Sequence, residues 1–323
     1  MGSSTSGNLI VPVKNQYPAN SPWTPLVPIQ LSAKAPVIWC KLEFLNPSGS
    51  TKDRIARYIL GNAFQRGQVK PGITVIEASS GSTSISMALV CAQLGLRFIA
   101  VLPEGVSNER GLMIRAYGGT IHFSSKDAGI QGCIRESERL AAETGAFLPR
   151  QFSNPENVEA HQFGTAREIL EQIPGHLVDA IVSGVGTGGT LIGLMRGCNS
   201  DRHLQRAFLA RPVDLGRTRE QECCGFSCRI PAVMECASGL FRESDYLNLS
   251  TIEVSDEEAI ETARELIRLG FPVGPSSGLN YRAAMIAAQT VWPAKIVTVF
   301  PDRMERYFTT DLFRPFAGQS AKS

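Results

Sequence analysis

Residues 180–196 read AIVSGVGTGGTLIGLMR, and this stretch decides the expected fold. Its first residues, AIVS, form a short apolar run that ends at a glycine, which is typical of a strand buried on both faces of a parallel sheet. A turn rich in glycine and threonine (GVGTGGT, 184–190) follows, and then an apolar run of helical pattern. A strand, a glycine-rich turn and a helix in this order predict an α/β domain with a ligand site at the carboxyl end of the strand.

The turn at 184–190 has the composition of a phosphate-binding segment. Its glycines let backbone N–H groups approach an anion, its threonine hydroxyls add donors, and the start of the following helix supplies positive potential. The turn lacks the lysine of a nucleoside-triphosphate loop. Gly184, Gly186 and Gly189 have the spacing of a dinucleotide motif, but no acidic residue follows at a convincing strand end. An ordinary glycine-rich turn is the alternative for this segment alone.

Similar patterns recur along the chain on either side of this stretch. Residues 73–77 (ITVIE), 98–102 (FIAVL) and 296–300 (IVTVF) are predicted strands of the same buried kind. Glu257–Leu269 is a predicted helix, because Ser255 and Glu258 form a capping box before it and Gly270 ends it. Strands alternate with helices, so the fold class is α/β with largely parallel sheets.

Two further loops rich in glycine and serine, PSGSTKDR (47–54) and SSGSTS (79–84), each precede an expected helix. Lys52 lies in the first turn of one of these helices, where the helix dipole disfavours a cation. Because positive potential lowers the pKa of an amine, a nucleophilic lysine that forms a Schiff base is a reasonable hypothesis. An exposed lysine at a helix start is the alternative. Three such loops suggest one site assembled from several strand ends.

In their order along the chain, the segments NPSGSTKDR (46–54), SSGST (79–83), GVGTGGT (184–190) and GPSSG (274–278) resemble the cysteine synthase and cystathionine β-synthase family. These are the fold type II enzymes that depend on pyridoxal 5′-phosphate (PLP). The resemblance extends from Thr24 to Tyr307 and implies a tryptophan synthase β-like fold of two open, twisted-sheet α/β domains. The smaller, mobile domain would cover 46–155, and the larger would combine 1–45 with 156–323.

The resemblance also implies roles for single residues. Lys52 would hold the cofactor and act as the base at the substrate Cα. Ser276 would meet the pyridine nitrogen, and a neutral hydroxyl there favours β-elimination over transamination. The other cofactor contacts would be Ser82, Gly186, Thr187, Gly188, Gly189 and Thr190, and the substrate carboxylate would bind Ser79, Ser80, Gly81, Thr83 and Gln151.

The sequence departs from the family pattern at two places. Ser82 stands where asparagine is usual, a form more similar to the S-sulfocysteine synthase branch. Arg229 precedes Ile230 and Pro231 at the expected mouth of the site, as in family branches that use O-phosphoserine. Arginine suits a leaving phosphate through bidentate bonds, so we expect Arg229 to bind the donor; a solvated arginine is the alternative.

The resemblance therefore implies β-replacement on an O-activated L-serine, either O-phosphoserine or O-acetylserine. The reaction would pass through an aminoacrylate and give L-cysteine or an S-substituted cysteine. Three alternatives stay open: an amine nucleophile as in diaminopropionate synthases, an eliminase acting on serine or threonine, and a regulatory protein that binds PLP without turnover. The motifs identify neither the nucleophile nor the pathway nor any partner protein.

Composition narrows the remaining classes. At 43% hydrophobic and 19% charged residues, the chain can fill a core, and its net charge of +2 without a basic, aromatic-interleaved block disfavours nucleic acid. No secretory signal and no apolar run of about eighteen residues is visible, so we expect a cytoplasmic protein that binds no membrane. Its partners would be a small amino-acid substrate and a small nucleophile, and the resemblance adds a homodimer.

The cysteines and His161 are not expected to take part in the reaction. Cys40, Cys91, Cys133 and Cys198 lie in apolar or helical contexts and are expected to be buried, and His161 is expected to pack locally. The other four form a cluster of spacing CC-x3-C-x7-C, namely Cys223, Cys224, Cys228 and Cys236. Because paired CxxC ligands and a nearby histidine are missing, no metal site is predicted; structural zinc is the alternative, and the cluster receives no role.

Overall fold

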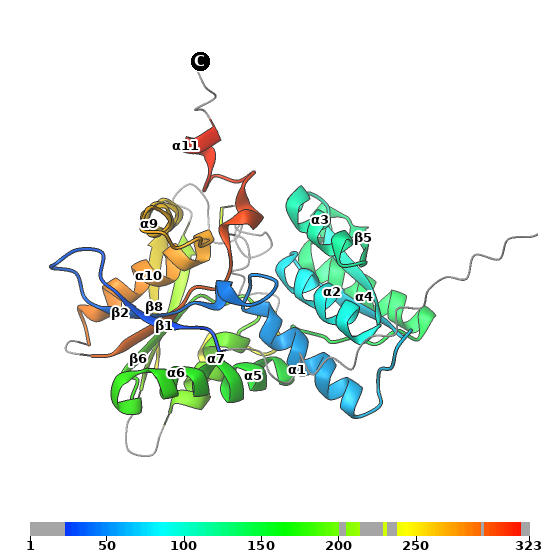
Figure 1. Cartoon of the computed structure of the whole chain (residues 1–323), viewed down its shortest axis with the longest axis horizontal. Helices are drawn as coiled ribbons and strands as arrows, with labels where there is room; N and C mark the ends of the chain where they lie inside the picture. Colours follow the sequence, from blue (N-terminus) through cyan, green and yellow to red (C-terminus); the bar gives the residue numbers. More distant parts are fainter. Residues whose placement is uncertain (1–22, 200–204, 214–228, 231–237, 292–293, 318–323) are drawn as a thin grey trace, which may run out of the picture.

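The computed structural model describes residues 23–199, 205–213, 229–230, 238–291 and 294–317. They form two sheets that lie in two lobes side by side, with helix α1 between them (Figure 1). The six-stranded sheet has the order β1-β2-β9-β6-β7-β8, and its strands are Leu26–Ile29 (β1), Ile38–Lys41 (β2), Ile296–Val299 (β9), Ala180–Ser183 (β6), Arg206–Val213 (β7) and Leu249–Ser255 (β8). The three-stranded sheet contains Thr74–Ala78 (β3), Arg97–Pro103 (β4) and Thr120–Ser124 (β5).

Helices surround both sheets. The smaller sheet is accompanied by α2 (Ser82–Leu94), α3 (Asn108–Ala116) and α4 (Gly129–Thr144) (Figure 1). The larger lobe contains α5 (Glu156–Ala160), α6 (Ala166–Gln172), α7 (Gly189–Cys198), α9 (Asp256–Arg268) and α10 (Pro275–Ala288), and α1 covers Lys52–Gln65. A π-helical turn, η3 (His161–Thr165), joins α5 to α6, the last short helix is α11 (Arg314–Ala317), and 3₁₀ turns lie at Glu43–Leu45 (η1), Lys126–Ala128 (η2), Pro174–His176 (η4), Glu243–Asp245 (η5) and Met304–Tyr307 (η6).

All strand pairs are parallel except β1 with β2, which confirms an α/β fold with largely parallel sheets. The four predicted strands correspond to β3, β4, β6 and β9, and every residue of β6 and β9 is buried, as expected for strands covered on both faces. The predicted helix is α9. Its capping box forms, because Ser255 accepts from the N–H of Glu258 while the Glu258 side chain accepts from Ser255.

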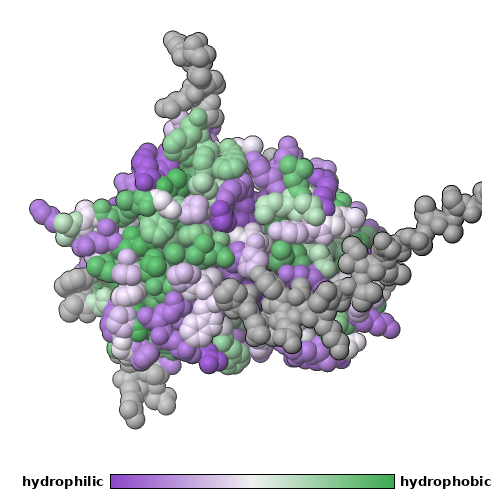
Figure 2. Space-filling model, viewed as in Figure 1, coloured by the Kyte–Doolittle hydropathy of each residue, from purple (hydrophilic) through white to green (hydrophobic). Residues whose placement is uncertain are grey.

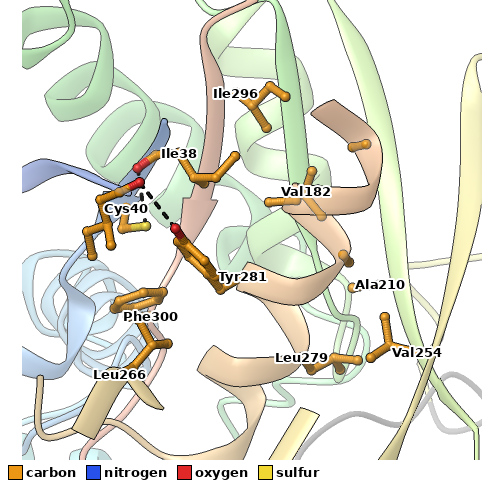
Figure 3. Close-up of a cluster of buried hydrophobic side chains, with 14 of the residues drawn as sticks. Ile38, Cys40, Val182, Ala210, Val254, Leu266, Leu279, Tyr281, Ile296 and Phe300 are labelled. Atoms are coloured by element: carbon orange, nitrogen blue, oxygen red, sulfur yellow. Dashed lines mark hydrogen bonds between the residues drawn. The ribbon is translucent and has the colours of Figure 1, made fainter. Parts of the chain in front are cut away.

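The main core of the larger lobe lies between its sheet and α10. Figure 3 shows Tyr281 of α10 among Ile38, Cys40 and Phe300, where its hydroxyl donates to the carbonyl of Ile29 at 3.2 Å. This bond satisfies the one polar atom of a fully buried ring. The four cysteines expected to be buried are buried, namely Cys40, Cys91, Cys133 and Cys198. The core therefore fixes β9 and α10, whose ends carry the site described below.

The smaller sheet lies wholly within 46–155, and every strand of the larger sheet lies outside that range. The division of the chain into a mobile and a fixed domain at these bounds stays a prediction. None of the described helices is both long and apolar enough to cross a membrane.

Candidate active site

The larger lobe and the starts of α1 and α2 surround an open cavity of about 590 Å³, counting the part open to solvent. The predicted site residues that line the cavity are Lys52, Ser82, Gly186, Thr187, Gly188, Thr190 and Ser276. The other lining residues are Ser50, Thr51, Ser183, Gly184, Leu191, Asn280, Val299, Pro301 and Asp302. Residues from five separate segments of the sequence thus meet at one site, as the three loops suggested.

Lys52 is the first residue of α1 and lies at the cavity wall. Burial lowers the pKa of its amine, and the charge of Asp302 opposes this shift. The loop before it is held to the segment after β9, because Thr51 donates to the carbonyl of Pro301 at 2.7 Å. The lysine is therefore a half-buried amine on a backbone segment that is held in place, which suits a nucleophile.

A buried cluster of charges holds the first turn of α1. Arg54 donates to Glu43 at 2.7 Å and forms a bidentate pair with Glu168, and Lys41 donates to Glu168 at 2.8 Å. Arg54 in turn holds the pKa of the Glu43 carboxyl well below its usual range, although burial alone would raise it. Because α1 begins two residues earlier, this cluster also positions Lys52.

The glycine-rich turn is closely backed by two side chains. Gly188 has φ +86°, and a Cβ there would lie 2.5 Å from Cβ of Phe241. A Cβ at Gly189 would lie 1.9 Å from Oδ1 of Asn157, whose amide donates to the Thr187 hydroxyl at 2.9 Å. Only glycine fits both positions. The turn leads directly into α7, whose first N–H groups have no partner within the helix and can bind an anion.

The predicted carboxylate loop lies at the start of α2. Ser79 accepts from the N–H of Gly81 at 3.0 Å, and Thr83 donates to Gln151 at 2.7 Å. Gln151 also donates to the carbonyl of Ala78 at 2.7 Å. Of this loop, Ser82 alone is among the lining residues of the cavity, so Ser79, Ser80, Gly81, Thr83 and Gln151 form a connected group next to it. Their role toward a substrate stays a prediction.

Glu77 lies beneath this loop and was not singled out from the sequence. Its buried carboxyl accepts from the N–H of Ala78 at 3.0 Å and from that of Gln151 at 3.1 Å. Burial raises the pKa of Glu77 to about 8. Glu77 thus fixes the backbone of Gln151 and, through it, Thr83.

Arg229 does not line the cavity in the described structure. Its guanidinium donates to Asp311 at 3.1 Å and is also bonded to Glu257. The expected contact with the donor therefore requires Arg229 to leave two carboxylates. The cysteines at 223, 224, 228 and 236 lie outside the described residues.

Among the lining residues that sequence reasoning missed, Asn280 and Asp302 have side chains that bear on the site. Asn280 accepts from the N–H of Gly184 at 2.7 Å and donates to the carbonyl of Val299 at 2.8 Å, which ties the glycine turn to β9. Asp302 follows β9 closely, and the rule that ligands bind at the carboxyl ends of strands could have found it.

His161 packs locally as expected: its ring bonds Thr165 at 3.0 Å and Thr190 at 3.3 Å, and burial lowers its pKa to about 3.

Comparison with known proteins identifies the chemistry of such a site. The sequence pattern of the family described as "Pyridoxal-phosphate dependent enzyme" matches residues 20–302. The chain belongs to this PLP-dependent family. It is 35% identical to cysteine synthase B of Campylobacter jejuni over 85% of this chain and 91% of that protein, and 33% identical to a cysteine synthase of Staphylococcus aureus over 90% and 94%. It is therefore a PLP-dependent enzyme of the cysteine synthase type.

Solved structures agree in fold. An O-ureido-L-serine synthase superposes with a TM-score of 0.81 at 32% identity, covering 93% of this chain and 94% of that one. The O-acetylserine-dependent cystathionine β-synthase of Helicobacter pylori superposes with a TM-score of 0.79 at 32% identity, covering 90% and 95%. These matches confirm the fold type II architecture expected from the sequence.

The lining residues fit PLP. Its aldehyde can react with an amine, and Lys52 is the amine on the cavity wall. Its phosphate suits the glycine turn before α7, and its ring nitrogen suits a hydroxyl such as that of Ser276. Among the described residues, Thr51 Oγ1 and Asp302 Oδ1 are buried without a hydrogen-bond partner, and a bound polar group would satisfy such atoms.

Proposed function

We propose that the chain catalyses β-replacement on an O-activated L-serine and releases L-cysteine or an S-substituted cysteine. The observation that carries this proposal is that Lys52, the glycine turn and Ser276 line one cavity beside a loop suited to a carboxylate. The names of the relatives, cysteine synthases and an O-ureido-L-serine synthase, support the same class of reaction.

PLP, when bound, supplies an electron sink for the loss of the Cα proton and the Cβ substituent. We assign to Lys52 the attachment of the cofactor and the removal of the proton from Cα, because its amine lies on the cavity wall and its pKa is lowered by desolvation. Ser276 would form a hydrogen bond to the ring nitrogen without protonating it. The cofactor would then withdraw electrons less strongly, which favours elimination at Cβ.

We assign the substrate carboxylate to Ser79, Ser80, Gly81 and Thr83, with Gln151 beside them. The start of α2 offers backbone N–H groups and hydroxyls to an anion. Arg110 supports this loop, because it donates to the carbonyl of Ser80 at 2.9 Å. Ser82 would face the cofactor instead, since it is the loop residue on the cavity wall.

The donor can be O-acetyl-L-serine or O-phospho-L-serine. The sequence favours O-phospho-L-serine through Arg229, whereas the ion pairs of Arg229 with Glu257 and Asp311 favour a donor that needs no arginine. One solved relative is named as dependent on O-acetylserine. We therefore place O-acetyl-L-serine first, with O-phospho-L-serine as the alternative.

The test is to mix the purified holoenzyme with each donor separately and to follow the visible spectrum of the cofactor. Sulfide, thiosulfate or a small amine is then added, and the product is identified by mass spectrometry. A spectral change with either donor and an S-substituted product supports the proposal, and Arg229→Ala decides whether the arginine serves the phosphate. A product formed only with an amine, or a change only with unactivated serine or threonine, would replace the proposed reaction. A spectrum that responds to no amino acid would favour a regulatory protein.

We also propose a homodimer, which the family resemblance implies. Figure 2 shows an apolar region over the lobe that contains the six-stranded sheet, and an apolar surface of this kind supports association. Light scattering of the purified chain tests this.

A further inference from the structure

Asp302 lies between the two loops that carry Lys52 and Ser276. Its backbone forms a bridge with Ser50, two residues before the lysine. Its carbonyl also accepts from the N–H of Gly274 at 2.9 Å, two residues before Ser276. The backbone of Asp302 is therefore held to both loops that carry the groups we assign to the cofactor.

Only one of the two carboxyl oxygens of Asp302 accepts a hydrogen bond from the described residues. Oδ2 accepts from the Tyr307 hydroxyl at 2.7 Å and from the Ser82 hydroxyl at 3.4 Å. Oδ1 has no hydrogen-bond partner among the described residues, although the side chain is 3% exposed. A buried carboxylate oxygen without a donor is costly, so the carboxylate is set up to interact with a further positive or donating group.

Lys52 and Asp302 are the two titratable residues among those that line the cavity. Each acts on the other: the Asp302 charge opposes the lowering of the Lys52 pKa by burial, and burial raises the pKa of Asp302 while the charges of Arg306, Arg110 and Lys52 oppose that rise. This pair of opposite charges faces the space that the cofactor would fill.

Arg306 and Arg110 also act on the Asp302 carboxyl through their charges, and each has a further hydrogen-bond partner. Arg306 donates to the carbonyls of Ser48 and Gly49, and Arg110 donates to the carbonyl of Ser80 with its guanidinium 5.3 Å from the ring centre of Tyr307. His161, which interacts with Lys52 electrostatically, is neutral at physiological pH because burial lowers its pKa to about 3. Within α1, Asp53 accepts from the N–H of Ser48 at 2.7 Å.

We propose that Asp302 is a positioning residue of the reaction, whose buried carboxylate keeps a proton on the Lys52 nitrogen and holds the Ser82 hydroxyl. A carboxylate at this place stabilises positive charge on the lysine nitrogen, whether the amine is free or attached to the cofactor. The lysine nitrogen would then be protonated in the resting enzyme up to a higher pH than burial alone permits. This proposal rests on Lys52 as the cofactor lysine, which is part of the proposed function.

The test measures the holoenzyme without substrate. The visible absorbance of the bound cofactor is recorded between about pH 6 and about pH 10, and the midpoint reports the loss of the proton from the lysine nitrogen. Asp302→Asn is expected to lower this midpoint by about one unit or more, because an opposite charge has been removed. Glu305→Gln is the matched control: the same charge is lost three residues along the chain, where Glu305 pairs with Arg303 at the surface, and the midpoint should not move.

An Asp302→Asn midpoint equal to that of the wild type overturns the proposal. If this variant does not take up the cofactor, Asp302→Ser and Asp302→Glu decide: a lower midpoint for the serine than for the glutamate variant supports the role of the charge, and equal midpoints overturn it. No donor or nucleophile enters the measurement, so its outcome is separate from that of the β-replacement test.

Discussion

Replacement of Gly188 by alanine tests the glycine turn most directly. Gly188 has φ +86°, a conformation that costs a residue with a Cβ about 1–2 kcal/mol. The added Cβ would also lie 2.5 Å from Cβ of Phe241, a buried residue of the core, and overpacking of this kind costs about 1–3 kcal/mol. We therefore expect Gly188→Ala to lower the free energy of unfolding by about 2–5 kcal/mol.

The assay is urea unfolding of the holoenzyme, followed by circular dichroism, together with a fluorescence titration of cofactor binding. Gly61→Ala is the control, because Gly61 lies within α1 and a Cβ there meets nothing within 4 Å. This control is expected to stabilise the protein by about 0.5–1 kcal/mol. If Gly188→Ala lost less than about 1 kcal/mol and bound the cofactor like the wild type, the turn would not be constrained as described.

Further substitutions test other parts of the site. Lys52→Ala should remove the visible absorbance that depends on attachment of the cofactor, and also all turnover, while circular dichroism shows a folded chain. Glu77, with a pKa of about 8, favours the protonated form in the folded state, so the free energy of unfolding should fall as the pH rises from about 4.5 to about 8. Glu77→Gln should remove this fall. The comparison is best made above about pH 6.5, because the buried His161, with a pKa of about 3, makes the free energy of unfolding rise with pH below that value. Glu168→Gln should cost about 3–5 kcal/mol in urea unfolding, because the buried cations Lys41 and Arg54 lose their shared partner; a loss near zero would show that the cluster is not needed.

The sequence predicted strands correctly where every residue of the strand is buried. The strands β6 and β9 are apolar on both faces and bounded by turns, so their pattern has one reading. β2 was not predicted, since its sequence IWCK ends in a lysine, which is rare in a buried strand. Its Lys41 is buried because Glu168, far away in sequence, neutralises it. A pairing over this distance leaves no local pattern.

The same limit applies to the residues of the site. Arg229 was predicted to bind the donor because arginine suits phosphate. In the structure its guanidinium pairs with Glu257 and Asp311, which lie in two other segments. Asp302 was not predicted as a site residue, although folding brings it to the cavity wall together with Lys52. Residue type indicates what a side chain can bind, whereas its long-range partners determine what it is free to bind.

The contacts of α1 bear on the predicted domain boundary at residue 46. Arg54 joins the first turn of α1 to Glu43 and Glu168 through buried charges, and the lysine loop is bonded to the segment after β9. The carboxylate loop is held instead by the smaller sheet, since Ser79 donates to the carbonyl of Val101 in β4 at 3.1 Å. A movement of the smaller sheet would therefore displace the carboxylate loop and leave Lys52 in place. For this reason we expect the moving part to begin after the first turn of α1, so that closure brings the substrate to a lysine and cofactor that do not move.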